Sequence, residues 1–365
     1  MADQAVDSLL ARYGQEHPGV RIERTSLSRP EFRAKLAEAV ASGVFPDIAA
    51  VDATDLPRLA EADAVADLTD RFERWGLAGD FLPAVRESVT HDGRVRGVPL
   101  RSTTTALVYN REHFQAAGIA SPPTTWEGLR TTAKALTSTD RAGLCFGGKD
   151  DDLTTTFLPL LWQAGGDVTG IDEQPSLDAL AHLDALVNTD RSAPAEVLGW
   201  TDADARQRFA EGRCAMVVTG PDAVPQLNQA GLDWAAAALP DGAAGPAGQL
   251  GGETWVVGRA GQVDRAWDVL TWLAEHPDNA TEFGGGLGAL PNRTGTVDAL
   301  AWQWDPNVPG FTAQLRSART PTAYGAQYPD VSRALATMAS RVLTGERTPD
   351  RAAADARAEI DRLLR

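Results

Sequence analysis

The spacing of apolar residues changes several times within the first 70 residues. Over 5–17, apolar residues recur every three to four positions, which predicts a helix. Alternation over 20–23 predicts a strand, and the nearly all-apolar run 46–51 predicts a strand covered on both faces. Helices are predicted over 28–42 and 56–62. Strands that alternate with helices predict an α/β fold with a largely parallel sheet.

The same kind of alternation continues to the end of the chain. A glycine-rich loop is predicted over 241–252, a second glycine-rich turn over 284–288, and a last helix after Thr348 and Pro349. No internal repeat is visible. The other predicted strands are 95–100, 106–109, 144–147, 214–218 and 255–257, and the other predicted helices are 126–136, 154–164, 176–188, 202–211 and 265–275.

Composition places the chain among ordinary globular proteins. It has 365 residues, of which 43% are apolar and 23% charged, and this length corresponds to roughly two domains. The net charge of −16 makes nucleic acids and anionic membranes poor candidates for partners. Only three of the 34 basic residues are lysine, which we attribute to an actinobacterial-like genome composition.

Two cysteines allow at most one disulfide bond. Cys145 and Cys214 each lie in an apolar run, so we interpret them as small buried hydrophobic residues. No window has the ~18 consecutive apolar residues of a transmembrane helix. The first residues lack the basic and apolar regions of a signal peptide, so either a leader is absent from this numbering or the protein is cytoplasmic.

Two segments resemble ligand-binding motifs of enzymes but lack a required feature. The segment Gly143–Asp150 resembles a phosphate-binding loop, but Asp150 stands where that loop needs Ser or Thr. The segment Gly284–Ala289 fits a dinucleotide-binding pattern but follows a helix instead of a strand. The five histidines lie far apart, and no hydrolase motif occurs. The sequence therefore predicts a protein without enzymatic activity, cofactor or metal.

Short phrases distributed over nearly the whole chain resemble the extracellular solute-binding proteins of ABC transporters. The resemblance is to the sugar-binding family that includes the maltose-binding protein. The order and spacing of the phrases make it specific. They are His17–Val20, Gly43–Asp52, Gly97–Leu100, Val108–Arg111, Phe114–Gly118, Pro122–Trp126, Phe209–Met216, Gly220–Pro221, Leu239–Pro240, Gly251–Gly252, Leu290–Pro291 and Thr344–Gly345.

The resemblance implies a two-lobed α/β periplasmic-binding-protein fold, with a ligand cleft between lobes that close on the ligand. We place the three hinge crossings near 108–111, 250–256 and 287–291. Lobe 1 would then comprise 1–108 plus 256–288, and lobe 2 would comprise 109–255 plus 289–365.

The family also implies the biological setting. The protein would be a monomer that delivers a di- or oligosaccharide to the permease subunits of an ABC importer. It would be extracellular, as a membrane-anchored lipoprotein or a periplasmic protein, and cytoplasmic only if Met1 is the true start. Family members have a β-strand before the first helix, and no residue of this chain matches that strand.

A sugar needs polar partners for its hydroxyl groups and flat rings for its C–H faces. On that basis and by resemblance, we predict a set of ligand-binding residues. They are Asp52, Thr54, Asp55, Arg101, Thr103, Asp151, Trp200, Asp222, Gly252, Glu253, Trp255 and Arg293.

Most of these candidates have a structural alternative. Asp52 and Asp222 are also suited to capping the helices that follow them, and Asp151 to a solvated acidic turn. Trp200 is equally suited to a hydrophobic staple. The remaining alternatives are solvent exposure for Arg101, an ordinary strand position for Thr103, a surface ion pair for Arg293, and a core position for Trp255 with Glu253 bonded to a hinge arginine.

Two other classes of function remain open at this stage. One is a glycosidase that uses a carboxylate pair such as Asp52 with Glu253, although nothing in the sequence selects such a pair. The other is a binding protein for an amino acid, a polyamine or iron.

Overall fold

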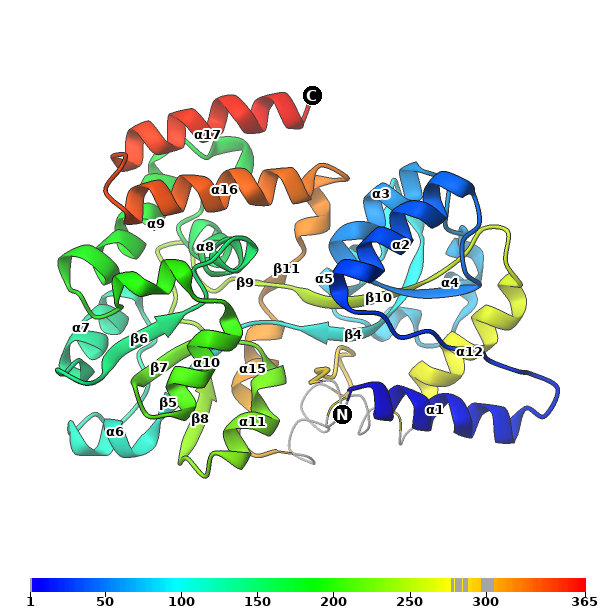
Figure 1. Ribbon diagram of the computed structural model, residues 1–365, viewed down its shortest axis with the longest axis horizontal. Helices are drawn as coiled ribbons and strands as arrows, with labels where there is room; N and C mark the ends of the chain where they lie inside the picture. The colour runs from blue at the N-terminus through cyan, green and yellow to red at the C-terminus, as the bar shows by residue number, and fades with distance from the viewer. Residues whose placement is uncertain (1, 277–278, 280–283, 285–287, 297–304) are drawn as a thin grey trace. The chain divides into compact units, whose positions relative to one another are not determined.

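The computed structural model describes residues 2–276, 279, 284, 288–296 and 305–365. By contacts the chain divides into two compact units (Figure 1). Unit 1 comprises Met1–Thr103, Leu250–Trp304 and Thr320–Ala326, and unit 2 comprises Thr104–Gln249, Asp305–Arg319 and Gln327–Arg365.

The contact division differs in detail from the expected lobe boundaries. The first boundary lies after Thr103, where 108 was expected. The second lies after Gln249, because the strand that begins at Gly251 pairs within unit 1 over its whole length. Of the third expected crossing, residue 287 lies outside the described residues, and Leu290 forms a bridge with Ser102 inside unit 1. Residues 305–319 and 327–365 then belong to unit 2.

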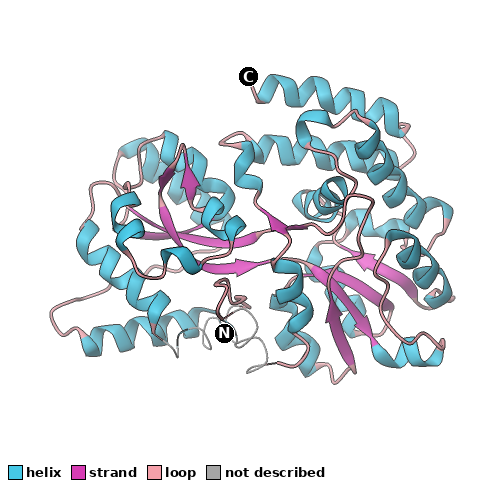
Figure 2. Ribbon diagram, turned by 180° about the vertical axis from the view of Figure 1, so that it is seen from behind, coloured by secondary structure: helices cyan, strands magenta, loops and turns pink. Residues whose placement is uncertain are grey.

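Unit 1 is built around a sheet of order β1-β10-β4, and Figure 2 draws the strands in magenta. Its strands are β1 (Ile48–Asp52), β10 (Gly251–Val257) and β4 (Gly97–Thr103), beside a small hairpin of β2 (Thr90–His91) and β3 (Arg94–Val95). Its helices are α1 (Ala2–Glu16), α2 (Arg29–Ser42), α3 (Leu56–Glu61), α4 (Thr69–Arg74), α5 (Pro83–Ser88) and α12 (Val263–Glu275).

Two sequence predictions about unit 1 are wrong. The sheet is antiparallel at both of its pairings: β10, which begins some 200 residues after β1 ends, lies between β1 and β4 and runs in the opposite direction to both. Residues 20–23 form no strand, and their side chains are exposed or half-buried. Alternation alone does not supply a hydrogen-bonding neighbour, which a strand requires.

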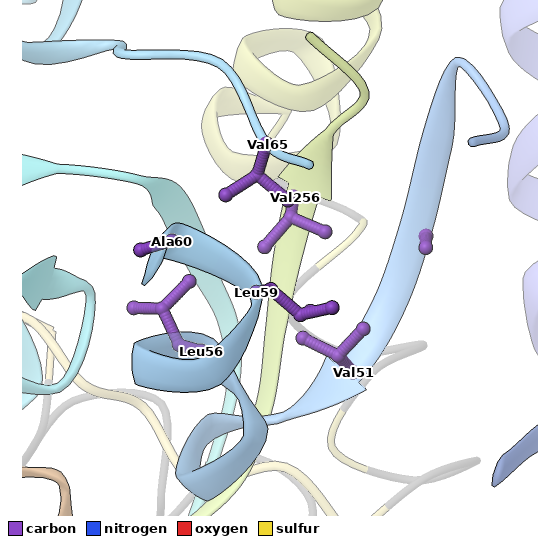
Figure 3. Packing of buried hydrophobic residues seen from close by; sticks show 7 residues of the cluster. Val51, Leu56, Leu59, Ala60, Val65 and Val256 are labelled. Carbon is purple, nitrogen blue, oxygen red and sulfur yellow. The ribbon is translucent and has the colours of Figure 1, made fainter. Parts of the chain in front are cut away.

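The core of unit 1 joins β1, α3 and β10. Val51 and Val256 are fully buried against Leu56 and Leu59 of α3, and Val65 closes the cluster (Figure 3). The apolar side chains of α2 also pack against this cluster, but they are only partly buried. The buried strand positions hold the ends of β1 and β10 in fixed register, and polar side chains follow at those ends.

Unit 2 contains a four-stranded sheet of order β6-β7-β5-β8, in which β6 and β7 are parallel. Its strands are β5 (Ala106–Asn110), β6 (Ala142–Phe146), β7 (Cys214–Thr219) and β8 (Trp234–Ala237), with a short parallel pair of β9 (Gly248–Gln249) and β11 (Ala318–Arg319). Its helices are α6 (Arg111–Ala116), α7 (Trp126–Leu136), α8 (Asp151–Gln163), α9 (Gln174–Asp184), α10 (Asp202–Ala210), α11 (Val224–Gln229), α15 (Pro309–Leu315), α16 (Tyr328–Leu343) and α17 (Pro349–Leu363).

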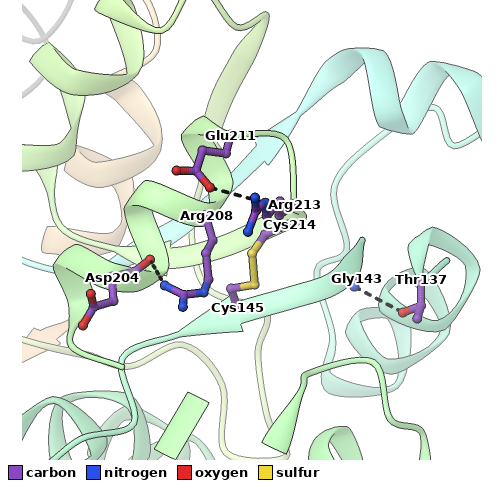
Figure 4. The surroundings of a disulfide bond; sticks show 8 residues. All are labelled: Thr137, Gly143, Cys145, Asp204, Arg208, Glu211, Arg213 and Cys214. Atoms are coloured by element: carbon purple, nitrogen blue, oxygen red, sulfur yellow. Dashed lines mark hydrogen bonds and ion pairs between the residues drawn. A yellow bond between two sulfur atoms is a disulfide. The ribbon is translucent and has the colours of Figure 1, made fainter. Parts of the chain in front are cut away.

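The two cysteines form a disulfide bond between β6 and β7. Cys145 and Cys214 are both buried, and their Cα atoms lie 6.0 Å apart (Figure 4). The predicted burial of both cysteines is confirmed, and they form the one disulfide bond that two cysteines allow. The apolar runs were read correctly as buried strands, but strand adjacency cannot be read from two segments 69 residues apart.

Candidate functional site

The sequence candidates divide unequally between the units. Asp151, Trp200 and Asp222 belong to unit 2, and the other nine belong to unit 1. Each group is described within its own unit.

In unit 1, three candidates occupy one row across the sheet. Asp52 of β1 is opposite Glu253 of β10, and Glu253 is opposite Arg101 of β4. Arg101 Nη1 lies 3.1 Å from Glu253 Oε1, and these side chains are 22% and 33% exposed. The row offers two carboxylates and a guanidinium, which accept and donate hydrogen bonds in pairs.

Gly252 is required by the backbone beside this row. Its φ of +114° is disfavoured for residues with a side chain, and an added Cβ would lie 2.1 Å from the Arg101 carbonyl oxygen. A Cβ on Gly251 would lie 2.9 Å from Thr103 Oγ1. The glycines thus let β10 approach β4 closely.

Trp255 lies in the interior of unit 1. The residue is 7% exposed and pairs with Ala50 and Val98. The register with β4 shifts between Glu253 and Trp255. Together with the Arg101–Glu253 ion pair, this arrangement matches the structural alternative raised for the two residues. A stacking role for Trp255 stays a prediction.

The loop after β1 carries the other acidic candidates. Asp52 precedes a short 3₁₀ turn over Ala53–Asp55, and its side chain makes no capping hydrogen bond there. Helix capping therefore does not account for Asp52. Thr54 and Asp55 are half-buried, and Arg58 Nη2 donates to Asp55 Oδ1 at 3.3 Å. Burial raises the pKa of Asp55, and the charge of Asp52 raises it further.

Arg293 is held in position by contacts of its own backbone and of the adjacent Asn292. It is half-buried and forms a bridge with Phe81. The adjacent Asn292 donates from Nδ2 to the Pro99 carbonyl at 2.7 Å and to Ser102 Oγ at 3.0 Å. Arg293 is thereby attached to the strand that also carries Arg101.

In unit 2, Trp200 contacts the loop that follows β6 on one side and helix α10 on the other. Its carbonyl accepts hydrogen bonds from the amides of Gly148 and Lys149 at 3.0 and 3.1 Å. The Arg208 guanidinium lies 3.9 Å from the centre of the Trp200 ring. These two amides are therefore engaged by a carbonyl, which agrees with the rejection of a phosphate-binding loop over Gly143–Asp150.

Asp222 forms an ion pair and does not cap a helix. The residue at the cap of α11 is Ala223, and Arg206 Nη1 donates to Asp222 Oδ2 at 2.6 Å. Asp151 is the exposed first residue of α8, and Ser332 Oγ donates to its Oδ1 at 3.2 Å. Asp151 thus lies in the first turn of a helix, whereas the alternative considered for it was a solvated turn.

Three residues that the sequence analysis did not select, Asp152, Asp202 and Arg206, belong to the same network of charged groups as Asp222. Arg206 Nε lies 3.1 Å from Asp202 Oδ2, and the Asp202 amide donates to Asp152 Oδ2 at 3.0 Å. Burial raises the pKa of Asp202 to about 6, against the opposing effect of Arg206. The position of Asp202 just after the capping residue Thr201 was the only sequence signal for it.

The described residues offer neither a metal site nor a membrane-spanning helix. No group of three or more His, Cys, Asp or Glu within them is placed to hold a metal ion. No helix among them is long and apolar enough to cross a membrane.

Comparison with known proteins places the chain among binding proteins. Residues 8–310 match the family described as bacterial extracellular solute-binding protein. The chain is 24% identical over 326 residues to the maltotriose-binding protein of Pyrococcus abyssi, covering 86% of this chain and 69% of that protein. It is 24% identical over 395 residues to the sn-glycerol-3-phosphate-binding periplasmic protein UgpB of Pectobacterium atrosepticum, covering 99% and 88%.

A solved structure supports the same placement. The cyclic α-maltosyl-1,6-maltose binding protein of Arthrobacter globiformis superposes with a TM-score of 0.85 at 26% identity, covering 100% of this chain and 96% of that one. The predicted family resemblance and fold class are confirmed.

Proposed function

Because this chain belongs to the bacterial extracellular solute-binding protein family, we propose that it is the substrate-binding component of an ABC sugar importer. It binds a di- or oligosaccharide and delivers it to the permease by closure of its two lobes. The names of relatives that bind maltotriose and a cyclic maltosyl-maltose support the choice of sugar.

The row Asp52–Glu253–Arg101 is the observation in this chain that supports the proposal most directly. Its side chains belong to three paired strands, and those of Arg101 and Glu253 are partly accessible. A sugar hydroxyl both donates and accepts, so it pairs with a carboxylate and a guanidinium at once. An affinity near 1 μM corresponds to about −8 kcal/mol, which several such pairs and one stacked ring can provide.

A thermal-shift screen tests the proposal. The panel contains maltose, maltotriose and a cyclic glucan, with glycerol 3-phosphate, spermidine and amino acids as non-sugar arms. A ligand that binds only the folded state adds about 2.7 kcal/mol of stability at a hundredfold excess over Kd. A Tm that rises only with a non-sugar solute would overturn the sugar assignment and keep the binding-protein class.

The glycosidase alternative receives its own test, because Asp52 and Glu253 are direct cross-strand neighbours. Side chains at such positions lie close enough for two carboxyl groups to flank one bond. Turnover of an aryl glycoside that is lost in Asp52→Asn would replace the binding function with catalysis. We expect no turnover.

Lobe closure is tested by small-angle scattering. The radius of gyration should fall when saturating sugar is added, as hinge closure requires. An unchanged radius would contradict closure on binding.

Export of the protein agrees with the disulfide bond, since such bonds persist in oxidising compartments. Anchoring as a lipoprotein and a monomeric state remain predictions.

A further inference from the structure

A cavity lies inside unit 2, between the sheet and helices α7, α8 and α9. Its volume is about 40 Å³, which leaves room for more than one water molecule. None of the predicted sugar-binding residues lines it. The lining is mostly apolar and includes Thr105, Trp126, Leu160, Gln163 and His182.

The aromatic part of the lining is rigidly held. The rings of Trp126 and His182 are stacked, with centroids 4.5 Å apart and planes 19° apart. Trp126 Nε1 donates to Gln163 Oε1 at 2.8 Å, and Gln163 Nε2 donates to the Ala247 carbonyl at 2.9 Å. These bonds satisfy the polar atoms of Trp126 and Gln163, so neither residue requires a ligand.

Two other polar atoms of lining residues are different. His182 Nε2 and Thr105 Oγ1 are both buried, and neither has a hydrogen-bond partner. His182 is 8% exposed. Buried polar groups in proteins nearly always have a partner, and an apolar cavity with a few convergent polar atoms is the usual form of a small-molecule site.

We propose that this cavity binds one small neutral molecule with an apolar body and a single hydroxyl group, whose hydroxyl bonds to His182 Nε2. The apolar body contacts the leucines and the Trp126 edge of the lining. The inference goes beyond sugar binding, because a ligand with many hydroxyl groups would leave most of them unpaired in this lining. Burial lowers the pKa of His182 to about 4, so at neutral pH the ring is uncharged and does not attract an anion.

Fluorine NMR with two matched probes tests the site. The first probe is 4-fluorophenol, and the second is fluorobenzene, which lacks the hydroxyl. We expect 4-fluorophenol to bind in slow or intermediate exchange and fluorobenzene to bind at least tenfold more weakly. In His182→Phe, which keeps a ring against Trp126, the two affinities should become equal. His113→Phe, the same change at a histidine of α6 outside the lining, should leave the preference intact.

A second variant protects the test against misfolding. Leu160→Phe adds volume to the lining without removing a polar atom, and it should abolish binding of both probes while the far-UV spectrum stays native. Equal binding of the two probes to the wild type would overturn the role of His182. Binding of neither probe would show that the cavity holds water only and would overturn the site. Sugar affinity, measured on the same samples, is unaffected if the cavity is independent of sugar binding.

Discussion

Arg101 and Glu253 form an ion pair across β4 and β10, and Glu253 is at the same time the direct cross-strand neighbour of Asp52. The pair is partly accessible, so its contribution to stability is small. A charged pair that contributes little to folding and lies among other polar groups at strand ends is well placed to bind a ligand.

Replacing Glu253 with Gln tests this role. The variant keeps the shape but loses a charged acceptor, so sugar binding should weaken at least tenfold, or about 1.5 kcal/mol, with Tm nearly unchanged. Titration calorimetry measures the first and thermal denaturation the second. Glu211→Gln, which removes an exposed ion pair with Arg213 in unit 2, is the control. Wild-type affinity in Glu253→Gln would make the pair purely structural.

Trp255→Ala separates packing from stacking. Because the indole is buried, the variant should lose about 3–5 kcal/mol of unfolding free energy. If the indole only packs in the core, the remaining folded protein keeps its sugar affinity, measured by calorimetry below Tm. A tenfold loss of affinity in that folded fraction would confirm the stacking role predicted from the sequence.

Gly252→Ala should be strongly destabilising. The new Cβ would meet the Arg101 carbonyl, and φ is +114°, so we expect a loss of at least ~2 kcal/mol. Urea denaturation measures it. Gly199→Ala is the matched control, since nothing lies within 4 Å of its added Cβ. Equal stability of the two variants would contradict the close approach of β10 to β4.

Reduction of the disulfide should lower Tm. The bond closes a long loop, and loss of such a bond typically costs about 2–5 kcal/mol. We expect a reducing agent to lower the Tm of the wild type under partly denaturing conditions that expose the buried sulfurs. The double variant Cys145→Ser/Cys214→Ser should have a lower Tm than the oxidised wild type, and reductant should not change it. A reductant effect that persists in this variant would have another cause.

The stability of unit 2 should depend on pH through Asp202. Its pKa is raised to about 6 in the folded protein, above the unfolded value of ~3.9. The folded state therefore holds the Asp202 proton more tightly than the unfolded state does. This difference contributes on the order of 2 kcal/mol to the free energy of unfolding below pH 4, and the contribution is lost as pH rises to about 6. Asp202→Asn mimics the protonated form, so its stability relative to wild type should increase between pH 4 and pH 7.

The neighbouring Asp204 provides a control of opposite sign. Hydrogen bonds from Thr201 lower the pKa of Asp204, so Asp204→Asn should be more harmful at pH 7 than at pH 3. Urea denaturation at several pH values measures both variants. The same pH trend in both would mean that the electrostatics of Asp202 are wrongly assigned.

Local patterns in the sequence determined most helices and the buried strands. The helix predicted over 265–275 is α12 (Val263–Glu275), and the helix predicted over 126–136 is α7 (Trp126–Leu136). These predictions succeed because helical periodicity and buried apolar runs are properties of neighbouring residues. The order of short phrases along the chain also identified the family and the fold class, which no single phrase did.

Tertiary structure decided which distant segments become neighbours. Insertion of β10 between β1 and β4 makes the sheet antiparallel and pairs Asp52, Glu253 and Arg101. The approach of β6 to β7 brings Cys145 and Cys214 together, and packing of α9 beside α7 stacks His182 on Trp126. Each pairing joins residues dozens to about 200 positions apart. Local periodicity carries no information about such contacts, because they depend on how whole strands and helices pack.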